Sequence, residues 1–256
     1  MFEAKLNEGI LIKKLVDSIK DLVSDINLDV SSTGISLQAM DSSHVALVTL
    51  RLDSEGFESY RCDKQLTLGV SISNLAKVLR CGGNEDAITL SCEEEPSKLK
   101  VKFENESKFN FYNIKKNIEN KKQCEFELAL ITIDTEHLGI PDTKYTSLIT
   151  MSSSEFARIT RELYAINETV QIVADKNSVK FSVANETIGG GFTYEPNDSD
   201  SLEQKVTITS DTTVDLSFAL RYLTMFTKAS TVGQQVSLYL SKEFPLMVEY
   251  KLASLG

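Results

Sequence analysis

A pattern that occurs four times along the chain constrains its fold more than any other feature. Each copy is an amphipathic segment with apolar residues at helical spacing, followed by short segments in which apolar and polar residues alternate as in strands. The predicted helices begin near residues 9, 72, 154 and 217. These starts lie 63 apart within each half (72 − 9 and 217 − 154) and 145 apart between halves (154 − 9 and 217 − 72). The spacing predicts two similar domains, each built from two helix-and-strand units.

The alternating strands predict an α+β fold with antiparallel sheets. Each sheet has one apolar and one polar face, so the helices must cover the apolar face. We expect an N-terminal domain over 1–127, an extended connector over 128–142 and a C-terminal domain over 143–256, with two helices packed on sheets in each domain. Leu130, Ile131 and Ile133 give the connector more apolar surface than a solvated linker needs.

Composition narrows the functional classes. A chain of 256 residues, 41% hydrophobic and 25% charged, can bury a sizeable core. No apolar run reaches the length of a membrane helix, and acidic residues stand where a signal peptide needs basic ones, so we expect a soluble protein of the cell interior. The four cysteines form no CxxC motif and there are only two histidines, which favours free thiols over a metal site; we expect no cofactor.

The net charge of −10 argues against a protein that grips nucleic acid over its whole surface. Cations nevertheless recur on the polar faces of all four predicted helices, and in each helix two of them lie three or seven residues apart, which places that pair on one stripe. They are Lys13, Lys14 and Lys20, then Lys77 and Arg80, then Arg158 and Arg161, then Arg221 and Lys228. Any single helix shows lysines and arginines to water, but four equivalent helices in an acidic chain predict a positive surface for the backbone of duplex DNA, read without sequence preference.

Two predicted edge strands suggest how copies of the chain associate. They are the strand around residues 124–130 in the first half and the strand over 188–194 in the second. Pairing one with the other between subunits is a head-to-tail contact, which closes into a ring if the rotation allows. Two similar domains per chain would then give a pseudo-sixfold ring from three chains.

The stretch Asp41-Ser42-Ser43-His44 has the residue types of a hydrolase site. Adjacent residues on one loop cannot easily converge as nucleophile, base and orienting group, and no G-x-S-x-G motif accompanies them. The triple glycine over 189–191 matches neither a dinucleotide fingerprint nor a P-loop, and is typical of close backbone approach in an edge strand. We therefore expect no enzymatic activity.

The chain resembles the eukaryotic sliding clamps, the proliferating cell nuclear antigen family, over essentially its whole length. The matching stretches include MFEAKL, LQAMDSSHVALV, SEGFESYRCDKQLTLGV, KVLRCGGNED, HLGIP, EFARI, FALRYLTMFTKA and PLMVEYKLASLG. The resemblance implies a homotrimeric ring in the nucleus that encircles duplex DNA, is loaded by a separate clamp loader, and tethers DNA polymerases and factors of repair and translesion synthesis. An alternative is a peptide-binding scaffold of the same repeats that never encircles DNA.

The resemblance also assigns roles to single residues. The helix cations, joined by Lys5, would face DNA. A pocket for a short motif of partner proteins would be lined by Met40, His44, Val45, Leu47, Leu138, Ile140, Tyr145 and Pro245. Phe126, Gly190 and Phe192 would lie at the subunit interface, and Lys176 matches a position modified by ubiquitin-like proteins.

The sequence departs from the family pattern in two places. About a dozen extra residues lie near 113–123, beside the predicted interface strand, in which Phe126 stands where the family usually has tyrosine. The sequence ends at Gly256, where the family continues with a Tyr-rich strand and a tail that walls the partner pocket. We expect these departures to affect trimer strength and peptide affinity.

Overall fold

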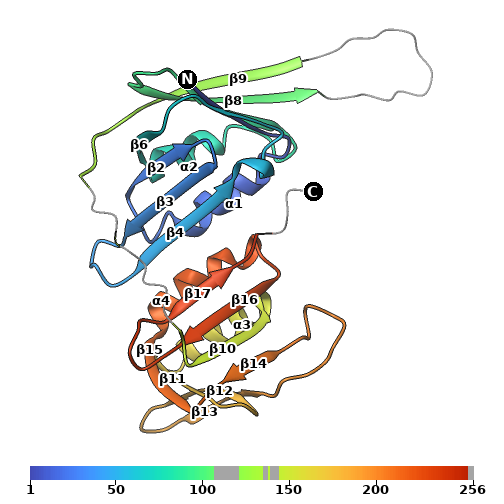
Figure 1. Ribbon diagram of the computed structural model, residues 1–256. Helices are drawn as coiled ribbons and strands as arrows, with labels where there is room; N and C mark the ends of the chain where they lie inside the picture. The colour runs from blue at the N-terminus through green and yellow to red at the C-terminus, as the bar shows by residue number, and fades with distance from the viewer. Residues whose placement is uncertain (107–120, 135–137, 139–143, 253–256) are drawn as a thin grey trace, which may run out of the picture. The chain divides into compact units, whose positions relative to one another are not determined.

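The computed structural model describes residues 1–106, 121–134, 138 and 144–252 (Figure 1). The chain divides into two compact units, Met1–His137 and Leu138–Ala253. Each unit combines two α-helices with antiparallel sheets, which confirms the predicted α+β class. The predicted ends of the connector, at 128 and 142, stay predictions.

Unit 1 contains two sheets and two helices. The helices are α1 (Ile10–Ile19) and α2 (Ile72–Leu79), and a short 3₁₀ turn spans Ser54–Gly56. The strands are β1 (Phe2–Leu6), β2 (Asp25–Ser31), β3 (Gly34–Met40), β4 (Leu47–Asp53), β5 (Ser59–Cys62), β6 (Leu66–Ser71), β7 (Ala87–Cys92), β8 (Lys98–Glu106) and β9 (Lys121–Ala129). One sheet has the order β5-β1-β7-β8-β9 and the other β4-β3-β2-β6.

Unit 2 repeats this plan with two four-stranded sheets. Its helices are α3 (Ser153–Tyr164) and α4 (Leu220–Phe226), and a 3₁₀ turn spans Thr227–Thr231. The strands are β10 (Ser147–Ser152), β11 (Thr169–Ala174), β12 (Val179–Ala184), β13 (Gly189–Tyr194), β14 (Thr207–Ser210), β15 (Val214–Ala219), β16 (Gln235–Leu240) and β17 (Met247–Tyr250). The sheet orders are β14-β10-β16-β17 and β13-β12-β11-β15.

The apolar stripe of each helix is buried, as its period requires. In α1 the stripe includes Ile12, Leu15 and Val16, and α2 buries four apolar residues. In unit 2 the ring of Phe156 on α3 packs 6.2 Å from that of Phe181 on β12. The polar faces of the helices are therefore left to present the charged side chains.

The ends of two helices differ from the sequence prediction. The fourth helix was expected from residue 217, but Ser217–Ala219 still pair with β11, opposite Gln171 and Thr169, so the helix begins at Leu220. The first helix ends at Ile19 rather than continuing to Val23. The observed starts, 10, 72, 153 and 220, therefore do not keep one constant offset.

Both predicted edge strands are confirmed as edges. β9 is the last strand of its sheet, beside β8, and the two form a long antiparallel pair (Figure 1). β13 is the first strand of its sheet and pairs only with β12 in the described part of the chain. Each therefore has one side with backbone groups available to a further strand.

The described start of the predicted connector lies along β6. The amide of Ile131 donates to the carbonyl of Gly69 at 2.9 Å, and the Asn27 side chain donates to the carbonyl of Ile133 at 3.1 Å. A Cβ at Gly69 would come within 2.0 Å of the Ile131 oxygen, so this contact requires glycine. None of the helices in the described ranges has the length and apolar character needed to cross a bilayer.

Candidate functional site

Each of the four helices carries an exposed cation that makes no ion pair with any described residue. These cations are Lys14 on α1, Lys77 on α2 with Arg80 at its C-cap, Arg161 on α3 and Arg221 on α4. The Lys77 ammonium donates to the neutral side chain of Asn74, at 3.5 Å. An exposed, unpaired ammonium or guanidinium is available to a phosphate at the cost of little more than its own hydration.

Other predicted DNA-facing cations already have partners. The Lys20 ammonium lies 2.5 Å from the Asp17 carboxylate, and the Lys5 ammonium lies 3.1 Å from that of Glu58. Lys228, in the 3₁₀ turn after α4, is exposed and also has a partner. These pairs lie at the surface and exchange readily with water, so they reduce but do not abolish the positive charge offered.

Lys13 serves the fold of unit 1. Its ammonium donates to the carbonyl oxygens of Gly82 and Gly83, at 2.7 and 2.5 Å, in the loop that follows α2. Burial lowers its pKa, an effect that the nearby Asp86 carboxylate opposes. Lys13 thus ties α1 to the end of α2 and lines a cleft of about 240 Å³ between the two helices, where Lys14 and Arg80 also lie.

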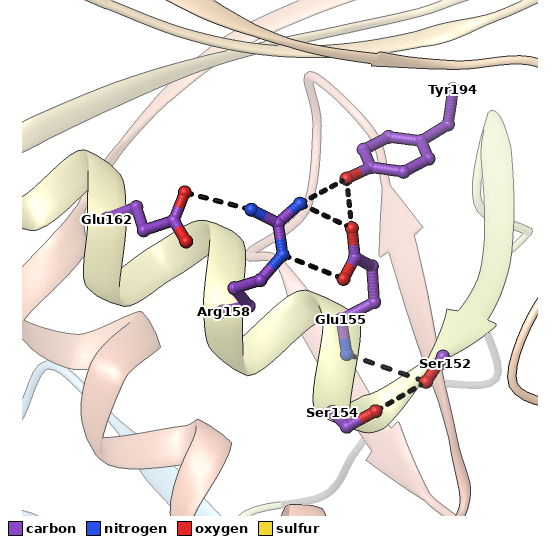
Figure 2. A network of polar contacts seen from close by, with 6 residues as sticks. All are labelled: Ser152, Ser154, Glu155, Arg158, Glu162 and Tyr194. Carbon is purple, nitrogen blue, oxygen red and sulfur yellow. Dashed lines mark hydrogen bonds and ion pairs between the residues drawn. The ribbon is translucent and has the colours of Figure 1, made fainter.

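Arg158 is the most heavily paired of the helix cations (Figure 2). Its guanidinium donates to both carboxylate oxygens of Glu155, at 2.9 and 2.6 Å, and to Glu162 at 2.9 Å. These hydrogen bonds raise the pKa of Arg158 and lower that of Glu155. Because two carboxylates surround one guanidinium, this group presents no net positive charge to a phosphate.

The loop after β3 explains the Asp-Ser-Ser-His stretch. The buried carboxylate of Asp41 accepts from the amides of Val45 and Ala46, at 2.8 and 2.6 Å, and from both the amide and the hydroxyl of Ser43. Burial alone would raise the pKa of Asp41, but these hydrogen bonds outweigh it and hold the pKa well below the usual range. With its acceptors used to shape the loop, Asp41 is unavailable to orient a catalytic histidine.

This loop presents an apolar surface in unit 1. His44 has a positive φ of 56°, and Val45 beside it is 66% exposed. Leu47 is also exposed and lies opposite the half-buried Met40 across the β3–β4 pair. Large apolar side chains held in water by a rigid loop are typical of a docking surface.

Tyr145 and Pro245, two residues of unit 2 that were assigned to the partner pocket, lie in contact with each other. The hydroxyl of Tyr145 donates to the carbonyl of Pro245 at 3.3 Å, and its ring lies 5.6 Å from that of Tyr239 and 5.9 Å from that of Phe244. Leu138 is 43% exposed. Ile140 lies outside the described residues, as do most of the extra residues near 113–123.

The residues assigned to the subunit interface lie on the two edge strands. Phe126 on β9 is half-buried, with its ring 6.2 Å from that of Phe103, and Phe192 on β13 is half-buried as well. A Cβ at Gly190 would meet nothing within 4 Å, whereas one at Gly191 would lie 2.1 Å from the Phe181 carbonyl oxygen. Close backbone approach therefore explains Gly191 but not Gly190.

Lys176, the modification candidate, is exposed in the turn between β11 and β12. The Asp175 carboxylate fixes this turn by accepting from the amides of Asn177 and Ser178, at 2.7 and 2.9 Å. The lysine is thus presented on a short, well-defined turn.

Sequence reasoning missed two residues of the Arg158 group, Glu155 and Tyr194. Glu155 had a readable signal, because Ser152-Ser153-Ser154-Glu155 has the S-x-x-E spacing of a helix start, and its amide donates to the Ser152 hydroxyl. The tyrosine lies 36 residues from the arginine, so only the packing of β13 could reveal the contact.

Comparison with models of known protein families shows to which family the chain belongs. Two repeated α+β units with cations on their helices are the architecture of DNA sliding clamps. The family model described as proliferating cell nuclear antigen, N-terminal domain, matches residues 1–137, and that described as proliferating cell nuclear antigen, C-terminal domain, matches residues 139–256. The chain therefore belongs to the proliferating cell nuclear antigen family. Members of this family are sliding clamps, non-enzymatic scaffolds that act on DNA.

Proposed function

We propose that three copies of this chain form a closed ring around duplex DNA and tether DNA polymerases and other replication and repair factors, including those of translesion synthesis, to the template. A separate clamp loader places the ring on DNA, and the site of action is the nucleus. Family membership supports this proposal, and so do the two edge strands, which offer one pairing side each.

The observation that carries the DNA contact is the exposed, unpaired cation on each of the four helices. An acidic chain has no structural need for such side chains on every helix. Hydrated lysines and arginines without a glycine-rich phosphate loop suit loose contacts that exchange between phosphates, which a sliding ring requires. A scaffold that only bound peptides would not need them.

We also propose that the loop over 41–46, with Val45 and Leu47, docks a short motif of partner proteins. Exposed aliphatic side chains and the half-buried Met40 fit the apolar anchors of such a motif. Lys176, exposed on its turn, is a proposed site for attachment of ubiquitin-like modifiers.

The helix cations can be tested with two variants of equal charge change. In the first, Lys77, Arg80, Arg161 and Arg221 are replaced by alanine; in the second, alanine replaces four exposed cations that lie off the helices, Lys64, Lys180, Lys242 and Lys251. We expect processive synthesis with the loader and a polymerase to fall about tenfold or more, and salt sensitivity of DNA retention to weaken, in the helix variant only. Equal losses in both variants would refute the assignment of the helix surface to DNA.

A further inference from the structure

The edge strand β13 has only two large side chains, Phe192 and Tyr194, on its core face. Three of its six residues are glycines, so half of the strand has no side chain with which to pack. Phe192 and Tyr194 lie opposite the buried Phe181 and Val179 of β12 and pack against the core of unit 2. As an edge strand with few side chains, β13 needs other contacts to hold its position.

The Arg158 group supplies such contacts (Figure 2). The Tyr194 hydroxyl donates to Glu155 at 2.6 Å and accepts from Arg158 at 3.4 Å, and the Arg158 guanidinium lies 4.8 Å from the centre of the Phe192 ring. Burial and the hydrogen bond to Glu155 raise the pKa of Tyr194 to about 12, so the hydroxyl stays a donor at neutral pH. Helix α3 is thereby joined to both large side chains of β13.

The opposite edge strand has a matching surface. Phe126 on β9 lies opposite the fully buried Val101, and is thus on the core face of its sheet, as Phe192 is in unit 2. Both rings are half-buried because each lies at an edge. Gly190, on the same face as Phe192, leaves open space there. Pairing β13 with β9 of a second copy would cover both rings and use that space.

We propose that Arg158, together with Glu155 and Tyr194, positions the edge strand β13 for pairing with β9 of a second copy of this chain. Arg158 is then a positioning residue of the subunit interface and not one of the cations that contact DNA. This inference rests on the proposed ring and assigns one of its helix cations a different task.

Arg161 provides the matched control. It lies on the same helix, three residues further on, is exposed, and forms no ion pair with a described residue. Replacing either arginine by alanine removes the same charge. Arg158→Lys adds a sharper comparison, because lysine keeps the charge but loses the two-pronged hydrogen bonding to Glu155 and the planar stacking on Phe192.

The measurement is the protein concentration at which half of the chains are trimeric, taken from mass photometry or sedimentation. Because the side chains of Arg158 and Glu155 are partly exposed, their hydrogen bonds contribute only moderately. We therefore expect Arg158→Lys and Arg158→Ala to weaken each interface about tenfold. The midpoint should then rise about thirtyfold, because the dissociation constant of a trimeric ring contains all three interfaces and scales with the square of concentration. Tyr194→Phe should shift it in the same direction by less.

Three further results complete the test. With the trimer saturated, Arg158→Ala should retain wild-type salt dependence on DNA, whereas Arg161→Ala should reduce it at an unchanged trimer midpoint. If the wild type is trimeric and Arg158→Lys has the same midpoint concentration, this inference is wrong while the proposed ring stands. A wild-type chain that stays monomeric would overturn the ring and this inference together. Thermal unfolding of each variant separates loss of pairing from loss of folding.

Discussion

Asp41 should stabilise unit 1 far more than an aspartate in a loop usually does. Its carboxylate is 7% exposed and is the acceptor for the amides of Ser43, Val45 and Ala46. In Asp41→Ala the buried Ala46 amide loses its partner, while the other two amides can turn to water. One unsatisfied buried donor and the loss of charge-assisted hydrogen bonds together cost about 3 kcal/mol.

The assay is urea unfolding followed by far-UV circular dichroism, with Asp53→Ala as the control. Asp53 is in the same unit, but its side chain is 65% exposed and pairs with the exposed Arg51, so its removal should cost less than about 0.5 kcal/mol. Equal stabilities of the two variants would refute this account of the loop.

The effect of Asp41 should also depend on pH. Because folding depresses the pKa of Asp41, its contribution is present above the pKa of the unfolded chain, about 4, and is lost as the pH falls toward the folded-state pKa. The difference between wild type and Asp41→Ala should therefore be constant from about pH 6 to 8 and narrow below about pH 4. A gap that widened on acidification would contradict the sign.

Further substitutions test the edge and the docking loop. Gly190→Val should leave unit 2 folded, because no atom of the same chain lies where the new side chain begins, but it should prevent trimer formation. Gly191→Val should instead destabilise unit 2, because its Cβ would meet the backbone of Phe181. Thermal unfolding measures the stability of unit 2, and light scattering measures trimer formation. Val45→Glu should reduce binding of a clamp-binding peptide about tenfold or more without lowering the unfolding temperature. Leu202→Glu, at another exposed apolar side chain, should leave titrations with the same peptide unchanged.

The helices and most strands could be predicted because their patterns are local. The apolar period locates α1 and α2, and alternation locates strands such as β3 and β7. The strands β6 and β10 were not predicted from the alternation pattern, and the end of β15 was assigned to the fourth helix, because each strand continues into the next helix without a loop. No turn signal marks such a junction, and the pairing of β15 with β11, which moved the fourth helix, is a long-range contact.

Less of the candidate site than of the fold could be predicted from the sequence. Spacing alone places cations on helical polar faces, but it cannot show which charges are already neutralised. Lys13 is bound to carbonyl groups about 70 residues away along the chain, and Arg158 on helix α3 is bound to a tyrosine on strand β13. Asp41 and His44 are neighbours in sequence, yet the backbone amides, absent from any motif, decide what the carboxylate does.

Topological retention on DNA tests the central claim most directly. The protein is allowed to thread onto a linear duplex with one blocked end, the free end is then blocked, and the sample is washed at high salt, which screens ionic contacts but does not open a closed ring. A ring should stay on the doubly blocked duplex and be lost once the duplex is cut next to a block. Elution by salt regardless of the blocks, or retention that survives the cut, would contradict an encircling clamp.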